Sequence, residues 1–571
     1  MERNAKIEGR RGRLLPLPVG NSDWAHISSR CWCADKTQLI SGLLERETSV
    51  ALFTRPRRFG KTTAMRMLKA FFEKTDGDGA RLFDGMKVWH DSEWRAEQGK
   101  YPVIFITLKD AKGGTWSDVM ASIADVMAEE FLRHEKAFTC DECPQKWRRD
   151  FDVFQNKAAD PSTVETSLGV LARALHAHHG EKPVILVDEY DSPINYAATH
   201  GFGGEALQFF RNFLSGAMKD GEHCRMGILT GILRVAKEGV LSGLNNLKVY
   251  SVFDEAFSDC FGFTEDEVRG LLTYYGHPEK MDEARDWYDG YLFGGREMYN
   301  PWSLLNYVQD GFRPQPYWIS TSSNDLVADA LSRMTPRMRG VLADFFEKGA
   351  LSVPCAKDLG PYGTIQNSPK IIWSLLAHTG YLKVVSPPDD NGQATLAFPN
   401  RELVRVFRDE ILDPLECSPA AGDDLDDILR SLTTGDAEGF RKGVEAFLVS
   451  SASYFDTAKE DFFHGLLLGL LALGRDTFEI KSNRESGDGR PDILMKPRSG
   501  KPFPGVVLEL KSPTVAPDAS PEQIESALDA SAKAARGQID DKRYAAEMEA
   551  EGIPVLKYGV GFCGKRVVLA K

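Results

Sequence analysis

The stretch that decides the fold is SVALFTRPRRFGKTTAMRMLKAFF, residues 49–72. An apolar run leads into a turn, and Gly60-Lys61-Thr62 then opens a helix with an apolar face. This order is typical of a phosphate-binding loop, in which backbone N–H groups, a helix N-terminus and a lysine face an anion. The usual pattern G-x-x-x-x-G-K-[ST] has a glycine where this chain has Arg55. An arginine held at positive φ there would cost about 1–3 kcal/mol, which a fold tolerates locally.

Length and composition describe a globular, multidomain protein. The 571 residues predict about two to four domains. No apolar run reaches the about 18 residues of a membrane span, and FFHGLLLGLLAL at 462–473 fits a buried helix. The basic N-terminus, MERNAKIEGRRGRLL, lacks an apolar signal core, so we expect a cytoplasmic protein without membrane contact. The formal net charge of −13 argues against a chain that coats nucleic acid indiscriminately, while local basic surface stays open.

The nine cysteines give no disulfide framework, which suits a reducing compartment. Cys31-x-Cys33 and Cys140-x-x-Cys143 together have the ligand number of a four-thiolate zinc site, but no second C-x-x-C supports that hypothesis. Isolated structural cysteines are the favoured interpretation.

Short apolar, β-branched runs alternate with helical stretches, which predicts an α/β protein with a mainly parallel sheet flanked by helices. The runs are Ser49–Thr54, Val103–Leu108, Val184–Val187, Met226–Thr230 and Lys248–Val252. We expect a basic tail over 1–19, a nucleotide-binding domain over 20–262, a mostly helical region with aromatic-rich turns and a linker over 263–424, and a last domain over 425–571. That domain is predicted to have strands at Thr477–Lys481, Asp492–Met495 and Val506–Leu510.

The sequence VILVDE, residues 184–189, supplies the second half of a nucleotide-hydrolysing site. Alone, it is equally typical of a buried strand before a surface turn. With the glycine-lysine-threonine loop upstream, we expect Thr62 and Asp188 to hold Mg²⁺ and Lys61 to reach the β- and γ-phosphates of ATP. Glu189 is expected to orient or deprotonate the attacking water. Thr230 ends MGILTG, where it is placed like a polar sensor of the γ-phosphate.

These motifs resemble the AAA-ATPase-like family of P-loop proteins joined to a C-terminal domain of the PD-(D/E)XK nuclease superfamily. The matching motifs cover most of the chain: ADKTQLI (34–40), TRPRRFGKT (54–62), LVDEYDSPI (186–194), LTGILRVAKEGVLSGLNNL (229–247), FGFTEDEV (261–268), YDGYLF, YNPWSLL, HTGYL (378–382) and PNRE (399–402). The resemblance implies a P-loop sheet, a winged-helix-like middle region and a restriction-endonuclease-like last domain. It also implies nucleotide contacts from Arg58, Phe59, Gly60, Lys61, Thr62 and Thr63. CWCADKT departs from the family, which has an aromatic and an aliphatic residue before DKT, and this affects only local packing.

The same family carries arginine in place of the first loop glycine, so Arg55 is implied to be a family trait. If Arg55 only replaces a turn-permitting residue, Arg55→Gly leaves ATP hydrolysis within a few-fold. If Arg55 contacts phosphate or a partner acid, the rate falls by about ten-fold or more, about 1.4 kcal/mol in barrier terms. The mild outcome is our expectation.

The resemblance implies a nuclease centre built from an Asp at the start of one strand and Glu-x-Lys on the next. The candidates are Asp492, Glu509 and Lys511, with Glu460 available as a further metal ligand. Glu509 and Lys511 are two apart on a strand, so they share a face. A divalent metal, Mg²⁺ or Mn²⁺, would neutralise the carboxylates, while Lys511 positions or activates water.

Other interpretations stay open at this centre. The Glu-x-Lys pair alone is also typical of a surface ion pair on an edge strand. Gln538 resembles a family position that supports the site, and Glu485 also matches, with a role in substrate contact or structure. His464 is interpreted as a packed core histidine.

Two classes of function follow. The first is an ATP-driven enzyme that acts on nucleic acid, with DNA as the expected substrate, and cleaves it through the last domain. The second is a nucleotide-dependent regulatory switch whose nuclease-like domain only binds DNA or protein. The intact carboxylate sets favour cleavage. The arginine that would stabilise the transferred phosphate is Arg234, Arg57, Arg58 or an arginine of a neighbouring subunit in a homo-oligomer.

Overall fold

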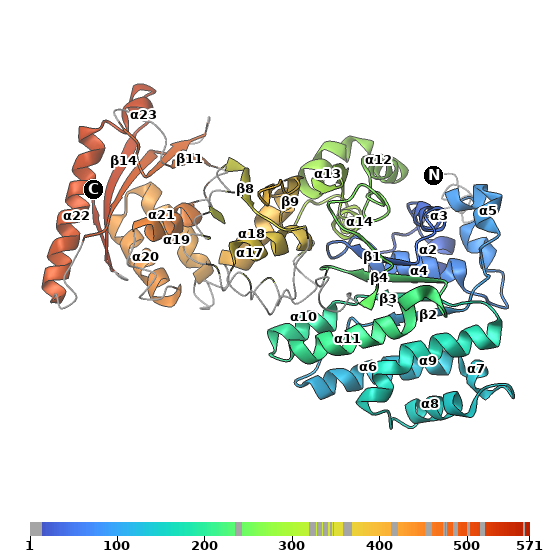
Figure 1. Cartoon of the computed structure of the whole chain (residues 1–571). Coiled ribbons are helices and arrows are strands. Elements are labelled where there is room, and N and C mark those ends of the chain that lie inside the picture. The colour runs from blue at the N-terminus through green and yellow to red at the C-terminus, as the bar shows by residue number, and fades with distance from the viewer. Residues whose placement is uncertain are drawn as a thin grey trace. The chain divides into compact units, whose positions relative to one another are not determined.

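The computed structural model describes residues 14–571 apart from the segments 235–242, 319–326, 328–329, 331–333, 335–337, 339–340, 343–344, 346–347, 358–367, 413–420, 452–459, 472–473, 475–476, 483–488, 499–502, 514–519 and 564–565. The chain divides into two compact units (Figure 1). The first unit comprises Met1–Arg333 with Ser352–Val406, and the second comprises Met334–Leu351 with Phe407–Lys571.

A five-stranded parallel sheet forms the centre of the first unit, in the order β2-β3-β4-β1-β5. Its strands are β1 (Val50–Thr54), β2 (Val103–Thr107), β3 (Val184–Asp188), β4 (Met226–Gly231) and β5 (Leu247–Tyr250). The predicted parallel sheet is therefore confirmed. Because β4 lies between β1 and β3, the carboxyl ends of these three strands meet at one edge, which is where open α/β sheets bind ligands.

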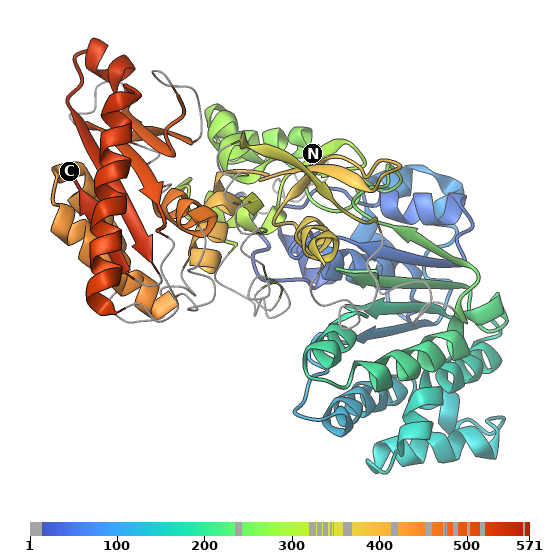
Figure 2. The same ribbon diagram turned by 60° about the vertical axis from the view of Figure 1, so that its left-hand side comes forward.

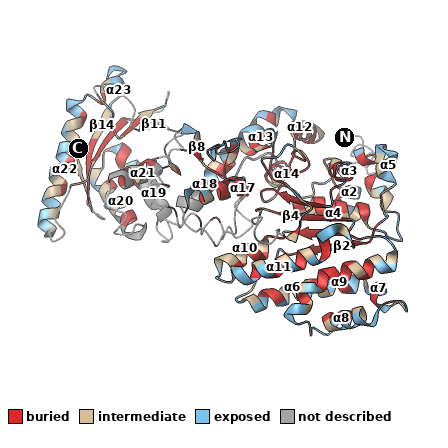
Figure 3. Cartoon of the chain, viewed as in Figure 1, coloured by how far each residue is buried: buried red, intermediate tan, exposed pale blue. Residues whose placement is uncertain are grey.

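Helices bury the apolar runs of this sheet. The helix after the glycine-lysine-threonine loop, α4 (Lys61–Phe72), buries Ala64, Leu68, Phe71 and Phe72, which lie three or four residues apart. Elsewhere α6 (Trp116–Arg133), α9 (Pro161–His179) and α11 (Gly203–Met218) lie side by side (Figure 1). Their inward faces are buried and their outward faces exposed (Figure 3). The remaining helices of this part are α2 (Trp24–Arg30), α3 (Gln38–Glu45), α5 (Ser92–Arg95), α7 (Glu135–Thr139), α8 (Gln145–Gln155) and α10 (Ser192–Thr199).

The middle of the chain is mostly helical, as expected. Its helices are α12 (Glu265–Tyr274), α13 (Met281–Tyr288), α14 (Pro301–Gln309), α17 (Pro369–Thr379) and α18 (Arg401–Leu412). Its strands are β6 (Tyr291–Phe293), β7 (Arg296–Met298), β8 (Ala350–Pro354), β9 (Lys383–Ser386) and β10 (Gln393–Ala397). β6 and β7 form an antiparallel hairpin that the sequence analysis did not predict. Gly294 and Gly295 both have positive φ, which a tight hairpin turn requires.

The second unit contains a mixed five-stranded sheet, whose strands lie in the order β11-β12-β13-β14-β15. Its strands are β11 (Phe478–Ser482), β12 (Ile493–Pro497), β13 (Gly505–Lys511), β14 (Val555–Cys563) and β15 (Arg566–Ala570), and only the β13–β14 pair is parallel. Its helices are α19 (Ala421–Thr434), α20 (Ala437–Ser451), α21 (Glu460–Leu471), α22 (Pro521–Asp541) and α23 (Ala546–Ala550). The three strands predicted from the sequence are present, with small shifts of their ends.

The long helix α22 packs directly on β14 (Figure 2). A Cβ atom on Gly559 would lie 2.1 Å from the carbonyl oxygen of Ala532, so only glycine allows this approach. On α21, which contains most of the apolar run at 462–473, Leu467 and Leu468 are buried. Of the helices that the structure describes, none combines the length and the hydropathy needed to cross a membrane.

The cysteines of the two predicted pairs all lie in the described part of the chain. Cys31, Cys33, Cys140 and Cys143 are described, and none of the four forms a disulfide. Among the described residues, no group of three or more His, Cys, Asp or Glu is arranged to hold a metal ion. In this structure these four described cysteines therefore do not form the four-thiolate group that the zinc hypothesis requires.

Candidate functional sites

The loop between β1 and α4 holds the lysine inside the protein. Gly60 has a φ of 80° and directly precedes the first helical residue, Lys61. The Lys61 ammonium donates to the carbonyl oxygens of Arg55 at 3.0 Å and Pro56 at 2.9 Å. Burial lowers the pKa of Lys61, while the carboxylate of Glu189 opposes that shift. A bound anion would offset the cost of burying this cation.

Three oxygen-bearing side chains converge at the carboxyl end of the sheet. The Thr62 hydroxyl, from α4, donates to Asp188 Oδ2 at 2.7 Å. The Thr230 hydroxyl, from β4, donates to Asp188 Oδ1 at 2.5 Å. Asp188 is the last residue of β3 and is almost fully buried. The structure thus brings together the predicted magnesium ligands and the predicted phosphate sensor, all with the hard oxygen donors that Mg²⁺ prefers.

Glu189 follows directly and has a φ of 52°. A non-glycine residue at positive φ carries strain of about 1–3 kcal/mol, and such residues cluster at functional sites. Its backbone N–H points to Thr230 Oγ1 at 3.4 Å. Burial raises the pKa of its carboxyl, and Lys61 is the largest influence in the opposite direction. This places the predicted base beside the predicted phosphate-binding lysine.

Asp191 is a buried residue of this site that the sequence analysis did not single out. Its Oδ2 accepts backbone N–H groups from Ile232 at 3.0 Å and Leu233 at 2.8 Å, and the Asn195 amide at 3.2 Å. Burial raises the pKa of Asp191. The carboxylate therefore fixes the segment after β4 against the segment that carries Glu189. The sequence did contain a signal for Asp191, because it is the third acidic residue of VILVDEYD and lies three residues after Asp188.

Arg55 turns away from the phosphate side. Its fully buried guanidinium donates to the carbonyl oxygens of Thr54 at 2.9 Å, Tyr250 at 2.8 Å and Phe257 at 3.2 Å. Burial lowers its pKa to about 10. It also faces two aromatic rings, at 5.4 Å from Phe261 and 5.2 Å from Phe293. Through these contacts Arg55 ties the end of β1 to β5 and to the segment that follows it.

The expected strain at Arg55 was wrong, because the positive φ in this loop falls on Arg58, at 69°, and on Gly60. The Arg58 side chain lies over the Trp302 ring at 4.7 Å and donates to the Tyr317 carbonyl at 3.3 Å. Its guanidinium thus contacts the middle region of the chain, at Trp302 and Tyr317, so the predicted nucleotide contact of Arg58 would be made by its backbone.

Phe59 is a packing residue in this structure. Its buried ring contacts Tyr291 at 4.8 Å and Phe293 at 5.0 Å, between ring centres. Its carbonyl accepts the Gly262 N–H at 3.1 Å. Phe59 therefore anchors the loop to the β6–β7 hairpin, and only its backbone stays as a predicted nucleotide contact.

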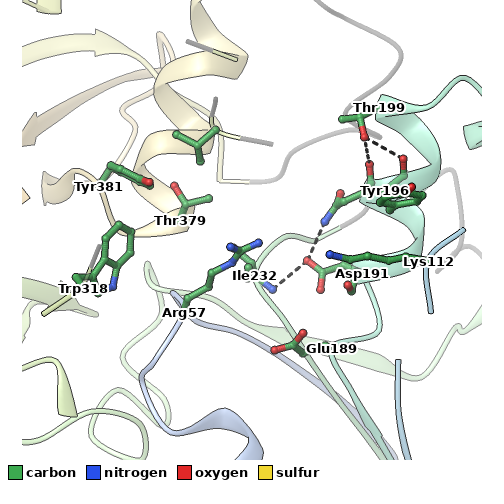
Figure 4. Close-up of a pocket in the computed structure, with 13 residues that line it drawn as sticks. Arg57, Lys112, Glu189, Asp191, Tyr196, Thr199, Ile232, Trp318, Thr379 and Tyr381 are labelled. Carbon is green, nitrogen blue, oxygen red and sulfur yellow. Dashed lines mark hydrogen bonds between the residues drawn. The ribbon is translucent and has the colours of Figure 1, made fainter. Parts of the chain in front are cut away.

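Two cavities of the first unit border the loop. One, of about 70 Å³, is lined by Arg57, Glu189, Asp191, Tyr196, Trp318 and Tyr381, among others (Figure 4). The other, of about 120 Å³, is lined by Gly60, Thr63 and Met67 of the loop and α4, and by the aromatic residues Trp24, Trp32 and Phe263. One cavity beside the loop is therefore lined by acidic and basic side chains among others, and the other cavity is lined largely by aromatic side chains.

In the second unit, Asp492 and Glu509 face each other across β12 and β13. The register pairs Ile493 with Leu508, which sets the two acids opposite one another. Asp492 Oδ2 accepts the Leu510 N–H at 2.8 Å, and the Asp492 N–H points to Glu509 Oε2 at 3.4 Å. Burial raises the pKa of Asp492, and the Leu510 N–H hydrogen bond opposes the shift most, followed by His464 and Lys511. Glu509 is buried beside Leu508 and Leu510, so the alternative of a surface ion pair on an edge strand is excluded, since β13 is a central strand.

Residues around this pair come from two helices. Gln538 of α22 donates to Glu509 Oε1, in a contact that joins helix and sheet. His464 of α21 has its Nε2 at 3.0 Å from the Asp492 carbonyl oxygen and 2.9 Å from Ser482 Oγ. Because the carbonyl only accepts, Nε2 carries a hydrogen. The interpretation of His464 as a packed core residue does not hold, since it is half-buried and hydrogen-bonded beside Asp492.

Two residues predicted for this centre have side chains outside the part of the chain that the structure describes. Glu460 is the first residue of α21, one helical turn before His464, but its side chain lies outside the described residues. Glu485 also lies outside the described residues. The described part of the centre therefore consists of two carboxylates, the lysine, the amide and the imidazole.

Comparison with known proteins identifies both parts of the chain. Residues 18–241 match a family model described as a predicted AAA-ATPase, and residues 458–571 match the PD-(D/E)XK nuclease superfamily. The chain is 31% identical over 361 residues to a protein of Azotobacter chroococcum mcd 1, described as an uncharacterized protein in the vnfD 5′ region. That match covers 61% of this chain and 64% of the relative, which is less than two thirds of its length.

Proposed function

Since the chain belongs to the predicted AAA-ATPase-like family and carries a C-terminal domain of the PD-(D/E)XK nuclease superfamily, we propose that it binds and hydrolyses ATP and cleaves the phosphodiester bonds of nucleic acid, with DNA as substrate. The observation that supports the ATPase half best is the convergence of Thr62, Asp188 and Thr230 through hydrogen bonds of 2.7 and 2.5 Å. The cross-strand pair of Asp492 and Glu509 supports the nuclease half.

In the ATPase half, the phosphates would lie against the N-terminus of α4, where Lys61 and the backbone N–H groups supply positive charge. Thr62 and Asp188 would hold Mg²⁺, which when bound spreads the negative charge of the phosphates. Glu189 would orient the attacking water and accept its proton, and Thr230 would hold Asp188 in place. The raised pKa of Glu189, caused by burial, suits a proton acceptor better than the pKa of an exposed carboxylate does.

The aromatic cavity next to Gly60 and Thr63 supports a place for the base of the nucleotide. Ligand cavities are typically apolar with a few polar groups, and aromatic walls suit a flat ring. Trp24 and Trp32 line it, so binding of a nucleotide should change tryptophan fluorescence. Trp24→Phe and Trp32→Phe then assign the signal, and a signal that survives in both variants would argue against this placement.

In the nuclease half, the carboxylates of Asp492 and Glu509 have the hard oxygen donors that suit Mg²⁺ or Mn²⁺, with Glu460 as a further proposed ligand. When bound, the metal would stabilise the charge that develops on the scissile phosphate. Gln538 holds Glu509, and the Leu510 N–H holds Asp492, so each ligand is oriented by the protein. Lys511, on the same face of β13 as Glu509, would place water or balance the phosphate charge.

The test incubates the pure protein with linear, nicked and branched DNA, with and without ATP and with Mg²⁺ or Mn²⁺. We expect metal to raise the thermal stability of the protein and to start cleavage. Asp492→Ala and Glu509→Ala should lose both effects, and Lys511→Ala should keep the stabilisation and lose cleavage. Glu479→Ala removes an exposed glutamate of the same sheet and serves as the matched control.

A nucleotide-dependent switch is the second candidate function. It predicts ATP binding without cleavage of any DNA or RNA form, whichever metal is present. A wild-type protein that behaves in this way would overturn the nuclease half, and the C-terminal domain would then be a module that binds DNA or protein.

A further inference from the structure

The loop before α4 carries the arginines Arg55, Arg57 and Arg58, and the structure gives them different surroundings. Arg55 is fully buried against backbone carbonyls. The Arg58 guanidinium lies over Trp302 and donates to the Tyr317 carbonyl. Arg57 instead lines the same cavity as Glu189. The loop thus directs one arginine to the core, one to the middle region and one to the side of the predicted base.

The cavity that Arg57 lines is built from several parts of the first unit (Figure 4). Glu189 and Asp191 come from the segment after β3, and Trp318 and Tyr381 come from the middle region. In Figure 4 the Arg57 side chain lies between this aromatic pair and the acidic segment. The volume of this cavity is about 70 Å³.

The charge of Arg57 acts on both partners of the predicted reaction. Burial lowers the pKa of Lys61 most. The acids around Lys61 raise this pKa, and the charge of Arg57 lowers it further. At Glu189, where burial raises the pKa most, Arg57 again acts to lower it. One guanidinium therefore lies within electrostatic reach of the lysine that would bind the γ-phosphate and of the acid that would receive the proton of water.

We propose that Arg57 is a catalytic residue that contacts the γ-phosphoryl group during ATP hydrolysis, so that the chain supplies its own arginine finger from the phosphate-binding loop. The proposal rests on the proposed ATPase function. In the step, the oxygen of water forms a bond to the γ-phosphorus while the bond from phosphorus to the β–γ bridging oxygen breaks and its electron pair leaves with ADP. The water proton passes to Glu189. Arg57 transfers no proton and stabilises the charge on the phosphoryl oxygens, the part an arginine finger plays in other nucleotide hydrolases.

Two other cations, Lys112 and Arg58, lie close to this region. Lys112 lines the same cavity, and its ammonium lies 5.9 Å from the centre of the Tyr196 ring. Arg58 is directed to Trp302. Lysine is also a point charge, whereas the planar fork of arginine matches two phosphoryl oxygens at once.

The experiment compares wild type, Arg57→Ala, Arg57→Lys and Arg57→Gln in full-length protein. Arg66→Ala is the matched control, because Arg66 is an exposed arginine of α4 that lies outside the loop. The readouts are kcat and KM for ATP, equilibrium binding of adenylyl imidodiphosphate, and binding of ADP with aluminium fluoride, which imitates the transferred phosphoryl group. Thermal unfolding checks that each variant is folded.

We expect Arg57→Ala to lower kcat by about 100-fold or more while adenylyl imidodiphosphate binds within a few-fold of wild type. Binding of ADP with aluminium fluoride should be lost, Arg57→Lys should recover only part of the rate, and added guanidinium ion should partly rescue Arg57→Ala. If Arg57→Ala does not fold, Arg57→Lys and Arg57→Gln carry the comparison.

Each contrary result has its own meaning. A kcat within three-fold of wild type in a folded Arg57 variant overturns the proposal and points to an arginine of another subunit or to Arg234. Equal losses in KM and in adenylyl imidodiphosphate binding, with no separate fall in kcat, also overturn it, because Arg57 would then only bind the ground state. If wild type itself neither binds nor hydrolyses ATP, the proposed ATPase function fails, and the proposal fails with it.

Discussion

Arg55→Gly restores the residue that the usual phosphate-binding loop has at this position, yet we now expect it to destabilise the first unit. The guanidinium is fully buried and donates to three carbonyl oxygens at 2.9, 2.8 and 3.2 Å. Hydrogen bonds to a charged group contribute about 1.5–3 kcal/mol each, so three contribute about 5–9 kcal/mol. Burying the cation lowers its pKa from 12.5 to about 10, which corresponds to a cost of about 3 kcal/mol. The net loss in Arg55→Gly is therefore about 2–6 kcal/mol, before the added backbone entropy of glycine.

Urea unfolding, followed by the fluorescence of the first unit, measures this loss. The midpoint of the transition should move to a lower urea concentration with little change in slope. Arg55→Lys keeps the charge but not the fork, so it should fall between Arg55→Gly and wild type. Arg81→Gly is the matched control: its side chain is 81% exposed in a surface ion pair, and we expect a change within about 0.5 kcal/mol.

The kinetics of ATP hydrolysis distinguish the remaining interpretations. Arg55→Gly should retain most of its kcat at temperatures where it stays folded, because the guanidinium does not face the phosphate side. An unchanged urea midpoint would refute the structural role. An unchanged midpoint together with a ten-fold fall in kcat would show that Arg55 contacts the nucleotide after all.

Three further predictions test other parts of the molecule. Lys61→Ala should weaken ATP binding and abolish hydrolysis, while Glu189→Gln should bind ATP without turnover; equal affinity of wild type and Lys61→Ala for a labelled ATP analogue would contradict the site. Burial raises the pKa of Glu402 from 4.5 to about 7, so the folded state binds more protons than the unfolded state between these values, and stability should fall by about 3 kcal/mol as the pH rises from 4.5 to 7. Glu402→Gln should remove that pH dependence, as measured by urea unfolding at several pH values, and an identical dependence in both proteins would exclude Glu402 as its source. Gly559→Ala should lower the melting temperature of the second unit, because its Cβ would meet the α22 backbone, whereas Gly537→Ala on that helix meets nothing within 4 Å and should not; equal melting temperatures would contradict the close packing.

The strands of the first sheet, and the first three strands of the second, could be predicted because their information is local, whereas β14 and β15 were missed. Buried parallel strands read as continuous apolar runs, and five such runs between helical stretches gave the first sheet. The phosphate-binding loop is likewise local, since its glycine, lysine and threonine are adjacent in sequence. The hairpin at Tyr291–Met298 was missed because its strands are only three residues long, too short for an alternating pattern to stand out.

The contacts of individual side chains could not be predicted, because their partners belong to segments that are far away in the sequence. Nothing near Arg55 in the sequence says that the carbonyls of Tyr250 and Phe257 will receive its guanidinium. The same holds for His464, whose partners are Ser482, at the end of β11, and Asp492, directly before β12. In the nuclease-like domain the sequence indicated which residues share a face, and the register of β12 and β13 was needed to set Asp492 opposite Glu509.

The missing glycine of the loop is now understandable in physical terms. A glycine at the first position of the usual pattern eases a turn, but here the backbone at Arg55 is not at positive φ, and the left-handed conformation falls on Arg58 and Gly60. With the turn made elsewhere, the first position is open to a side chain, and an arginine that points inward can join β1 to β5. The carbonyl of that same arginine receives the Lys61 ammonium at 3.0 Å. The substitution therefore leaves the phosphate-facing end of the loop, from Gly60 to Thr62, unaltered, and it adds a buried connection that holds the beginning of the loop to the sheet.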